Sequence, residues 1–228
     1  MAADQTIARS VLAEQVKDRL LQDILSGRYP PRYRIVETRV ARELGTSQAP
    51  VREALRGLEA LGVVEILPFR GARVRHPSRA ELLEAYAVRA ELEALAVRLG
   101  VPRMSDADLA EIETLLAAME RAADAEDRHA VAVADATFHA RLLGLAGNAT
   151  LERVWRSLEP YSRTYLTLVG PHADAHWTAG LHPGIVAALR TRDPAAVEAA
   201  LREHFDQASA QLAEDWADEP EEAGATRA

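Results

Sequence analysis

A short helical pattern, a glycine and a longer helical pattern follow one another between residues 37 and 61, and few folds accommodate that succession. The first pattern ends at Gly45, and Ser47 can cap the second by accepting a hydrogen bond from an amide of its first turn. Apolar residues then recur at spacings of three and four, which predicts a helix with one face packed on a core. They are Val51, Leu55, Leu58 and Leu61. This arrangement indicates a helix-turn-helix.

A different face of the longer helix carries one amide and two guanidinium groups. Gln48, Arg52 and Arg56 fall at i, i+4 and i+8 and are expected to be exposed. Such a helix suits the major groove of DNA, because residues at its start can read base edges while the arginines behind them hold phosphates. The sequence therefore predicts binding to double-stranded DNA.

Charge is unevenly distributed along the 228 residues, whose net charge is −8. Residues 1–77 contain 13 lysine or arginine residues and 9 acidic ones, a local net charge of +4. Residues 78–228 contain 14 and 26 of these, a local net charge of −12. Because interactions between exposed charges fade over roughly 8–10 Å, a basic first part can attract phosphates despite an acidic remainder. The asymmetry indicates two functional units.

Turn residues divide the first part of the chain into short elements. We expect residues 1–9 to be a disordered lead-in and Ser10 to cap a helix that ends near Gly27. Paired prolines follow and exclude helix there. Residues 63–67 and 72–75 read as two strands around a basic turn, which predicts a β-hairpin, or wing, after the helix-turn-helix.

Beyond Pro77 the pattern is helical throughout, with few glycines or prolines to interrupt it. Ser78 and Ser105 can cap the first two helices, and Asp108 would complete an approximate capping box. The predicted helices span 79–99, 105–124, 127–146, 148–169, 178–191 and 194–216.

These patterns predict a mainly α-helical fold in two domains. We expect a winged helix-turn-helix DNA-binding domain at 10–77 and an all-helical effector-binding and dimerisation domain at 78–217. The residues from 218 to 228 are expected to form an acidic disordered tail.

Composition restricts the remaining classes. No stretch of about 18 apolar residues occurs, so no transmembrane helix and no membrane partner are expected. No basic segment followed by an apolar run opens the sequence, so no secretory signal is expected. Cysteine is absent, which excludes disulfides and thiolate ligands. We expect a cytoplasmic protein.

Residues 10–77 resemble the winged-helix domain of GntR-family transcription regulators. The stretch from Ile35 to Gly45 carries the match, followed by Ser47 and the stretch from Pro50 to Leu55. The family's wing is matched by Arg70, Gly71 and Val74. Two departures stand out: Arg32 occupies a position where the family usually has glycine, and Gln48 one where it usually has arginine. The second is a base-reading position, so the operator cannot be inferred from relatives.

The second part is similar to the all-helical FCD effector-binding domain of the fatty-acid-regulator branch of that family. Together the two resemblances span about 90% of the chain. The residues that match the FCD pattern are Arg89, Leu92, Glu93, Asp135, Phe138, His139, Gly147, Asn148, His182, His204 and Phe205.

The helix-turn-helix and the resemblance together give a predicted DNA-binding set from the first part of the chain. It consists of Arg34, Thr38, Ser47, Gln48, Ala49, Pro50, Arg52, Arg56, Arg70 and Gly71. A solvated helix face is the alternative interpretation for the two arginines of the longer helix.

The FCD resemblance implies a metal site. Asp135 and His139 lie four residues apart on a predicted helix and so project from one face. With His182 and His204 they form a set of one carboxylate and three imidazoles, which suits a borderline divalent ion. Zinc is the first expectation, with nickel and manganese as alternatives. By spacing alone, such an Asp/His pair is more often a surface hydrogen bond, and it is the family pattern that favours a metal.

The same resemblance implies a small carboxylate effector. Arg89 is a natural partner for a carboxylate through a bidentate contact, but it could instead pair with Glu93 on its own helix. Asn148 belongs to the predicted effector set as well, although it could simply start a helix. His172 and His176 are interpreted as loop residues outside the site.

These expectations converge on a ligand-responsive transcription regulator that acts as a homodimer, represses its genes and is not an enzyme. A metal-dependent enzyme built on the helical domain is the main alternative, since a bound ion could activate water. An architectural DNA-binding protein whose helical domain only dimerises is a third hypothesis. It leaves the polar quartet without a role.

Overall fold

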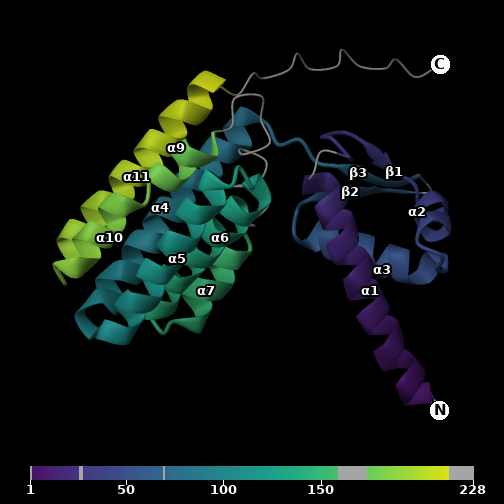
Figure 1. Cartoon of the computed structure of the whole chain (residues 1–228), viewed down its shortest axis with the longest axis horizontal. Coiled ribbons are helices and arrows are strands. Elements are labelled where there is room, and N and C mark those ends of the chain that lie inside the picture. Colours follow the sequence, from purple (N-terminus) through teal and green to yellow (C-terminus); the bar gives the residue numbers. More distant parts are fainter. Residues whose placement is uncertain (1, 26–27, 69, 159–173, 216–228) are drawn as a thin grey trace. The chain divides into compact units, whose positions relative to one another are not determined.

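The structure is a computed structural model that describes residues 2–25, 28–68, 70–158 and 174–215. The chain divides into two compact units, residues 1–76 and 77–228. The first combines helices with a small sheet, and the second is helical in all its described elements (Figure 1). This architecture confirms the predicted fold class, a winged helix-turn-helix followed by a helical bundle.

In the first unit, the long helix α1 (Ala2–Leu25) packs against the second helix of the helix-turn-helix. Val16, Leu20 and Ile24 recur at spacings of four and are all buried. The helix begins at Ala2, well before Ser10, in the stretch where the sequence analysis expects a disordered lead-in. The physical reason is that no glycine or proline occurs among residues 2–10, and alanine favours helix.

The helix-turn-helix consists of α2 (Glu37–Glu43) and α3 (Gln48–Ala60). Gly45, between them, has a φ of 63°, in the left-handed region that glycine adopts readily. Ser47 is the N-cap residue of α3 as expected, but its side chain makes no capping hydrogen bond. Leu61 was predicted to be in the apolar stripe yet is 39% exposed, because it lies beyond the last turn of α3.

Three short strands complete the first unit: β1 (Arg34–Ile35), β2 (Val64–Leu67) and β3 (Gly71–Val74). They form an antiparallel sheet in the order β1-β3-β2. The β2–β3 hairpin is the predicted wing. β1 was not predicted, because two residues are too few for an alternating pattern to be recognised.

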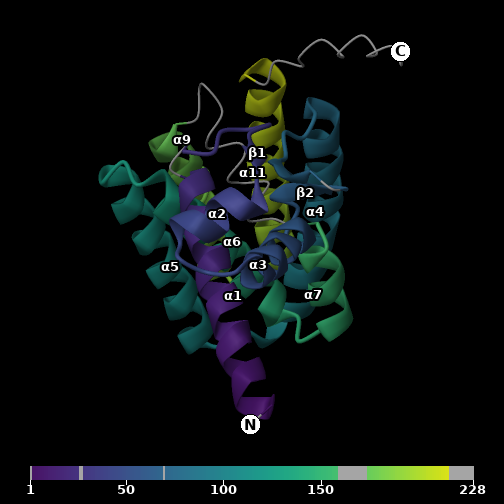
Figure 2. The ribbon, with the colours of Figure 1, turned by 90° about the vertical axis from the view of Figure 1, so that its right-hand side faces the viewer.

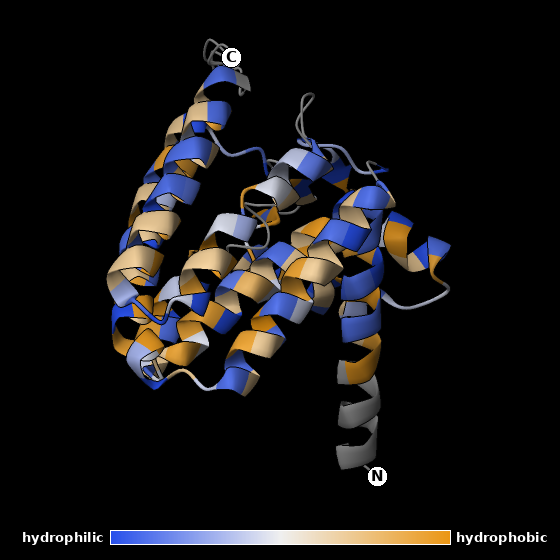
Figure 3. Ribbon diagram, turned by 60° about the vertical axis from the view of Figure 1, so that its left-hand side comes forward, coloured by the Kyte–Doolittle hydropathy of each residue, from blue (hydrophilic) through white to orange (hydrophobic). Residues whose placement is uncertain are grey.

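The second unit is a bundle of antiparallel and crossing helices (Figures 1 and 2). Its elements are α4 (Arg79–Gly100), the 3₁₀ turn η1 (Val101–Arg103), α5 (Asp106–Asp124), α6 (Arg128–Leu145), α7 (Ala149–Arg156), α9 (Ala175–Gly180), α10 (Pro183–Arg190) and α11 (Pro194–Asp215). The capping boxes at Ser78 and Ser105 are both formed, with Glu81 and Asp108 as partners. Apolar and polar residues alternate along each helix, as amphipathic helices around a shared core require (Figure 3).

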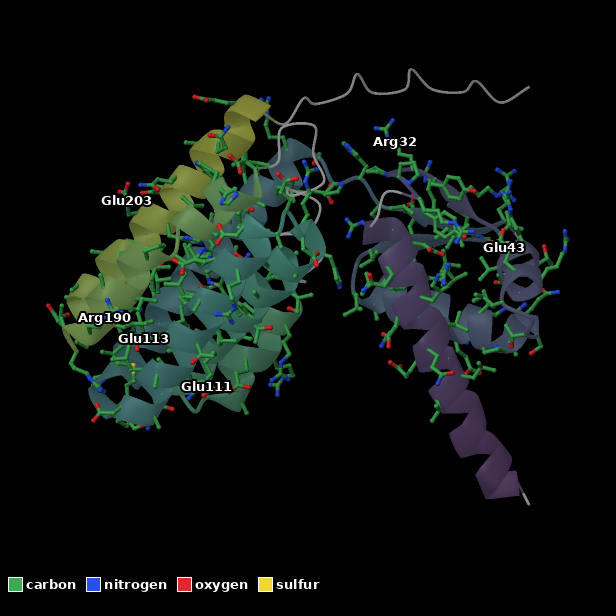
Figure 4. All side chains as sticks on the ribbon, in the orientation of Figure 1. Arg32, Glu43, Glu111, Glu113, Arg190 and Glu203 are labelled. Atoms are coloured by element: carbon green, nitrogen blue, oxygen red, sulfur yellow. The ribbon has the colours of Figure 1, made fainter. Side chains whose placement is uncertain are left out.

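Helix α4 is central to this bundle, because it packs against both α6 and α11. At its end Gly100 lies so close to α6 that an added Cβ would stand 2.5 Å from Cβ of Leu145. On the periphery Arg190 of α10 donates to Glu113 of α5 at 2.8 Å, and these two side chains meet in Figure 4. The packing brings α4, α6, α10 and α11 together around a common interior.

Two of the predicted helices differ from the observed ones. The helix expected at 148–169 ends as α7 at Arg156, and residues 159–173 lie outside the described part of the chain. The helix expected at 178–191 is instead two helices, α9 and α10, separated at Leu181 and His182. Pro183 explains the break, because it lacks an amide hydrogen and favours the first position of a new helix.

Candidate nucleic-acid interface and candidate metal centre

The polar face of α3 borders a groove of about 450 Å³ between α2, α3 and the wing. Most of the predicted DNA-binding set lines this groove. The lining members are Arg34, Thr38, Gln48, Arg52, Arg56, Arg70 and Gly71. Because Val51 and Leu55 are buried in the core behind them, the helix holds this face outward.

Three members of the predicted set lie outside the groove lining. Ser47 is exposed at the start of α3 and Ala49 is half-buried. Pro50 is buried, which the sequence analysis did not expect of a residue in the DNA-binding set. Its position in the first turn of α3 suits a residue without an amide hydrogen, since amides there have no partner within the helix. Pro50 therefore helps to start the recognition helix.

Within the groove, the guanidinium of Arg52 is held by a residue that the sequence analysis did not select. Glu37 of α2 accepts from Arg52 Nη2 at 2.8 Å and from Nε at 3.2 Å. The pair is partly exposed, and it fixes an otherwise flexible side chain before any ligand arrives. A carboxylate fifteen positions away on another helix leaves no local signal, so only the packing of α2 on α3 shows it.

The wing contacts β1 through a hydrogen bond and through a close approach of the two backbones. Arg34 Nε donates to the carbonyl of Arg70 at 2.8 Å. Gly71 has a φ of 87°, and an added Cβ there would stand 2.3 Å from the carbonyl oxygen of Ile35. Glycine is therefore required at position 71, because β1 and β3 approach each other too closely there for a side chain. Arg32 has a φ of 68°, which explains why glycine is usual at this position.

The second site is a cluster of buried polar side chains in the second unit. Asp135 and His139 stand one turn apart on α6, His182 is the N-cap residue of α10, and His204 lies on α11. Their exposed fractions are between 0 and 6%. Buried charged or polar groups are costly unless they are paired or bind a ligand, so this cluster calls for a partner.

The histidine rings are oriented by acceptors on their Nδ1 atoms. His139 Nδ1 lies 2.6 Å from Oε2 of Glu93, and His182 Nδ1 lies 3.0 Å from the carbonyl oxygen of Thr178. His204 Nδ1 lies 3.4 Å from the carbonyl oxygen of Leu181. Carbonyl and carboxylate oxygens only accept, so each Nδ1 carries a proton, and a ring without a second proton presents a lone pair on Nε2.

Those lone pairs face one another. Nε2 of His139 and Nε2 of His182 are 3.3 Å apart, and Asp135 Oδ1 lies 3.1 Å from the latter. One ligand atom from each of the three histidines falls within 4.8 Å of the others. Opposed lone pairs repel unless a cation lies between them. A single proton would satisfy one pair, whereas three imidazoles and a carboxylate match the donor set of a divalent ion. The residues therefore fit a metal.

The surroundings of His204 and Asp135 favour the protonation states in which these side chains can bind a metal ion. Burial is the main cause that lowers the pKa of His204, and His182 and His139 lower it further, so its ring is neutral near pH 7. Burial acts to raise the pKa of Asp135, but its interactions with His182, His139 and Arg89 outweigh burial and lower that pKa. Asp135 is therefore ionised.

Arg89 lies beside this cluster on α4, buried to 2% exposure. Its Nε and Nη2 both donate to Oε1 of Glu93 at 3.3 Å, so the pairing considered as an alternative is present. Three rings surround the guanidinium, with the centroids of Phe205, Trp155 and Tyr86 between 5.2 and 6.0 Å away. Nη1 has no hydrogen-bond partner among the residues that the structure describes, which leaves one edge of the fork available.

Other histidines and the second effector candidate have different surroundings. Asn148 caps α7, because its Oδ1 accepts from the amides of Thr150 and Leu151. The interpretation of Asn148 as a helix start is confirmed, and its expected effector role stays a prediction. His176 is exposed near Asp124, and His172 lies outside the described residues.

A cationic groove on a helix-turn-helix with a wing, joined to a helical unit with a buried donor cluster, is typical of DNA-binding regulators that carry a second, helical domain. The model described as "Bacterial regulatory proteins, gntR family" matches residues 12–74, and that of the FCD domain matches residues 84–207. The chain belongs to the GntR family and carries an FCD domain, so it is a DNA-binding transcription regulator and not an enzyme.

Individual relatives agree with this assignment. The probable D-xylose utilization operon transcriptional repressor of Paenarthrobacter nicotinovorans is 36% identical over 203 residues, which cover 89% of each chain. The crystal structure of a GntR-type regulator from Rhodococcus sp. RHA1 has a TM-score of 0.75 at 25% identity, covering 90% of this chain and 99% of that one. McbR of E. coli has a TM-score of 0.72 at 25% identity, covering 89% and 97%.

None of the described helices combines the length and the apolar character needed to cross a membrane.

Proposed function

We propose that this protein is a cytoplasmic repressor that binds a double-stranded DNA operator as a homodimer and responds to a small carboxylate. The DNA-binding domain comprises residues 10–77, and residues 78–217 sense the effector and dimerise. A dimer would present two α3 helices to half-sites one DNA turn, about 34 Å, apart. The printed name of the Paenarthrobacter relative supports the repressor assignment.

The groove between α2, α3 and the wing supports the DNA-binding role. Gln48 stands at the start of α3, where side chains reach base edges, and its amide suits adenine. Arg52 and Arg56 follow along the same face, and Arg70 belongs to the wing. In this proposal Arg34 and Thr38 contact the phosphate backbone, which positions the protein without reading sequence.

The opposed Nε2 lone pairs are the observation that carries the sensing role. Asp135, His139, His182 and His204 would hold a divalent ion, with zinc as the first candidate and nickel or manganese as alternatives. When bound, the ion supplies a Lewis acid that can accept a carboxylate oxygen. The free edge of the Arg89 fork would hold the other end of that carboxylate.

The effector class follows from this chemistry and from one relative. A carboxylate suits a cation and an arginine, and the name of the D-xylose regulator points to a sugar-derived acid. Effector binding between α4, α6, α10 and α11 would shift the helices that dimerise. Because the two DNA-binding domains of the dimer bind one operator together, a small change in their separation lowers operator affinity strongly.

Two substitutions separate the two roles. The operator is selected from a random DNA pool with the wild-type protein, and affinity is measured by fluorescence anisotropy at fixed salt. Arg52→Ala should weaken operator binding about 30-fold or more, because each of the two DNA-binding domains loses one contact worth about 1–3 kcal/mol. It should leave metal content unchanged. His182→Ala should lower metal content and abolish the effector response while operator binding persists.

Arg190→Ala is the matched control, because Arg190 is exposed on α10 and pairs only with Glu113 in the described structure. It should change neither quantity. The DNA-binding proposal is contradicted if no sequence is enriched from the pool, and the sensing proposal is contradicted if metal content does not depend on His182.

A further inference from the structure

Glu93 is a fully buried carboxylate that has no role in the proposal above. We propose that Glu93 is a positioning residue: it holds the proton of His139 on Nδ1 and so keeps Nε2 of that ring as a metal ligand. This inference rests on the proposed metal site. It assigns a specific function to a residue that touches neither the ion nor the effector.

The contact itself is short and secluded. Oε2 of Glu93 lies 2.6 Å from Nδ1 of His139, and both side chains are at most 1% exposed. Glu93 is on α4 and His139 on α6, the helices that Gly100 brings into close contact. A carboxylate on the outer nitrogen of a metal-ligating histidine fixes its tautomer and raises its basicity.

The other oxygen of Glu93 is fixed from three directions. Oε1 accepts from Trp155 Nε1 at 2.8 Å and from Nε and Nη2 of Arg89 at 3.3 Å each. The carboxylate therefore cannot rotate without losing these bonds. Because Oε1 already receives three N–H donors, the carboxylate is held as an acceptor, and Oε2 is its accepting atom toward His139.

His139 differs in this respect from the other two rings. Nδ1 of His182 and of His204 faces a backbone carbonyl, of Thr178 and Leu181 respectively, which no side-chain substitution removes. In the described part of the chain, His139 is thus the one ring of the three whose Nδ1 partner is a side chain that can be replaced. A single substitution can therefore test whether orientation of the ring contributes to metal affinity.

The outcome of Glu93→Gln follows from hydrogen-bond polarity. An amide has one accepting end and one donating end. Its oxygen will remain where Trp155 and Arg89 donate, so its NH₂ group will face His139. Nδ1 must then accept, and the proton moves to Nε2, where it points into the ligand cluster. The variant keeps the shape of the site but presents the wrong tautomer.

The test uses the full-length protein, its Glu93→Gln variant and Glu91→Gln as the matched control. Glu91 is on the same helix but exposed, and it pairs with Arg202. Zinc affinity is measured by competition with a chelator, and the His139 tautomer is measured by long-range ¹⁵N–¹H correlation in the metal-free protein. We expect Glu93→Gln to bind zinc 10- to 100-fold more weakly, the range seen for outer-sphere substitutions, and to carry the proton on Nε2.

The control should match the wild-type protein in both measurements. Unchanged zinc affinity in Glu93→Gln, or a proton that stays on Nδ1, would overturn the inference. If the wild-type protein binds neither zinc nor nickel nor manganese, the proposed metal site fails instead, and the tautomer measurement still tests the positioning role.

Glu93→Gln leaves Arg89 buried without its counter-ion, which can prevent folding. The double variant Arg89→Met/Glu93→Gln removes that charge, while Trp155 still donates to the amide oxygen. It should therefore fold and show the same Nε2 tautomer. A double variant that folds with its proton on Nδ1 contradicts the inference.

Discussion

Single residues act in this protein mainly through backbone shape and through the direction of hydrogen bonds. Gly71 and Gly45 both have a left-handed φ, but only Gly71 faces another strand. The histidines of the cluster are ligand candidates because each ring nitrogen has a defined neighbour. At this scale the geometry of one atom decides whether a substitution is tolerated.

Gly71→Ala should destabilise the first unit by about 2 kcal/mol or more, because the left-handed φ costs roughly 1–2 kcal/mol and the clash with Ile35 adds to it. Gly45→Ala is the control, since it has a similar φ and nothing within 4 Å. Chemical unfolding measures both. Equal losses in the two variants would show that the strand contact has no energetic effect.

His204 should make stability depend on pH in the metal-free protein. Its pKa is lowered by burial and by His182 and His139, so below about pH 6.5 the unfolded chain binds a proton that the folded chain does not. Unfolding free energy should therefore fall as pH decreases from about 6.5, by up to about 1.4 kcal/mol per unit. Asp135 adds a loss of the same sign only at lower pH, since its pKa is also lowered.

His204→Gln removes the titrating group, so its stability should vary less between pH 6.5 and 5 than that of the wild type. Denaturant unfolding with a chelator present gives both curves. The charged and titratable groups facing His204 are Arg89, Asp135, His139 and His182. A wild-type stability that is flat over this interval would contradict the expected neutral ring.

At the scale of elements, the spacing between helices determines which side chains meet in the buried polar cluster of the second unit. α4 carries Arg89 and Glu93, α6 carries Asp135 and His139, and the two pack closely where Gly100 meets Leu145. On the outer surface Arg202 of α11 pairs with Glu91 of α4. These contacts hold three helices of the cluster at fixed separations.

Gly100→Ala should lower the free energy of unfolding by about 1–3 kcal/mol, because the added methyl group would stand 2.5 Å from Leu145 and force α4 and α6 apart. Gly144→Ala provides the opposite control. It lies in α6 with only the end of Arg141 nearby, so alanine should stabilise the helix by up to about 1 kcal/mol. Thermal unfolding followed by circular dichroism distinguishes the two signs.

At the scale of the whole molecule, the chain forms two compact units with different polar features. The first has the cationic groove, and the second has the buried donor cluster. The local net charges of +4 and −12 fit this division, because only the first part must approach phosphates. Ligands should therefore stabilise the units separately.

Zinc should raise the unfolding temperature of the second unit and leave that of the first unchanged. A ligand that binds only the folded state adds about 2.7 kcal/mol at 100 times its Kd. Calorimetry of the full chain, with and without zinc, should show one transition moving. Operator DNA should raise the unfolding temperature of the first unit instead. If zinc shifted both equally, the units would not be energetically separate.

The sequence by itself determined the features that depend on near neighbours. Apolar spacings of three and four predicted the helix-turn-helix, and alternating apolar and basic residues predicted a strand of the wing. Serine residues before the helices predicted two caps. Each of these signals lies within a few positions of the chain. The tertiary structure alone decided which distant groups meet: Glu37 on Arg52, Glu93 on His139, and β1 beside Gly71. It also revealed the break before Pro183 and the burial of Pro50. Partners far apart in the chain leave no periodic signal, because their contact depends on how helices pack.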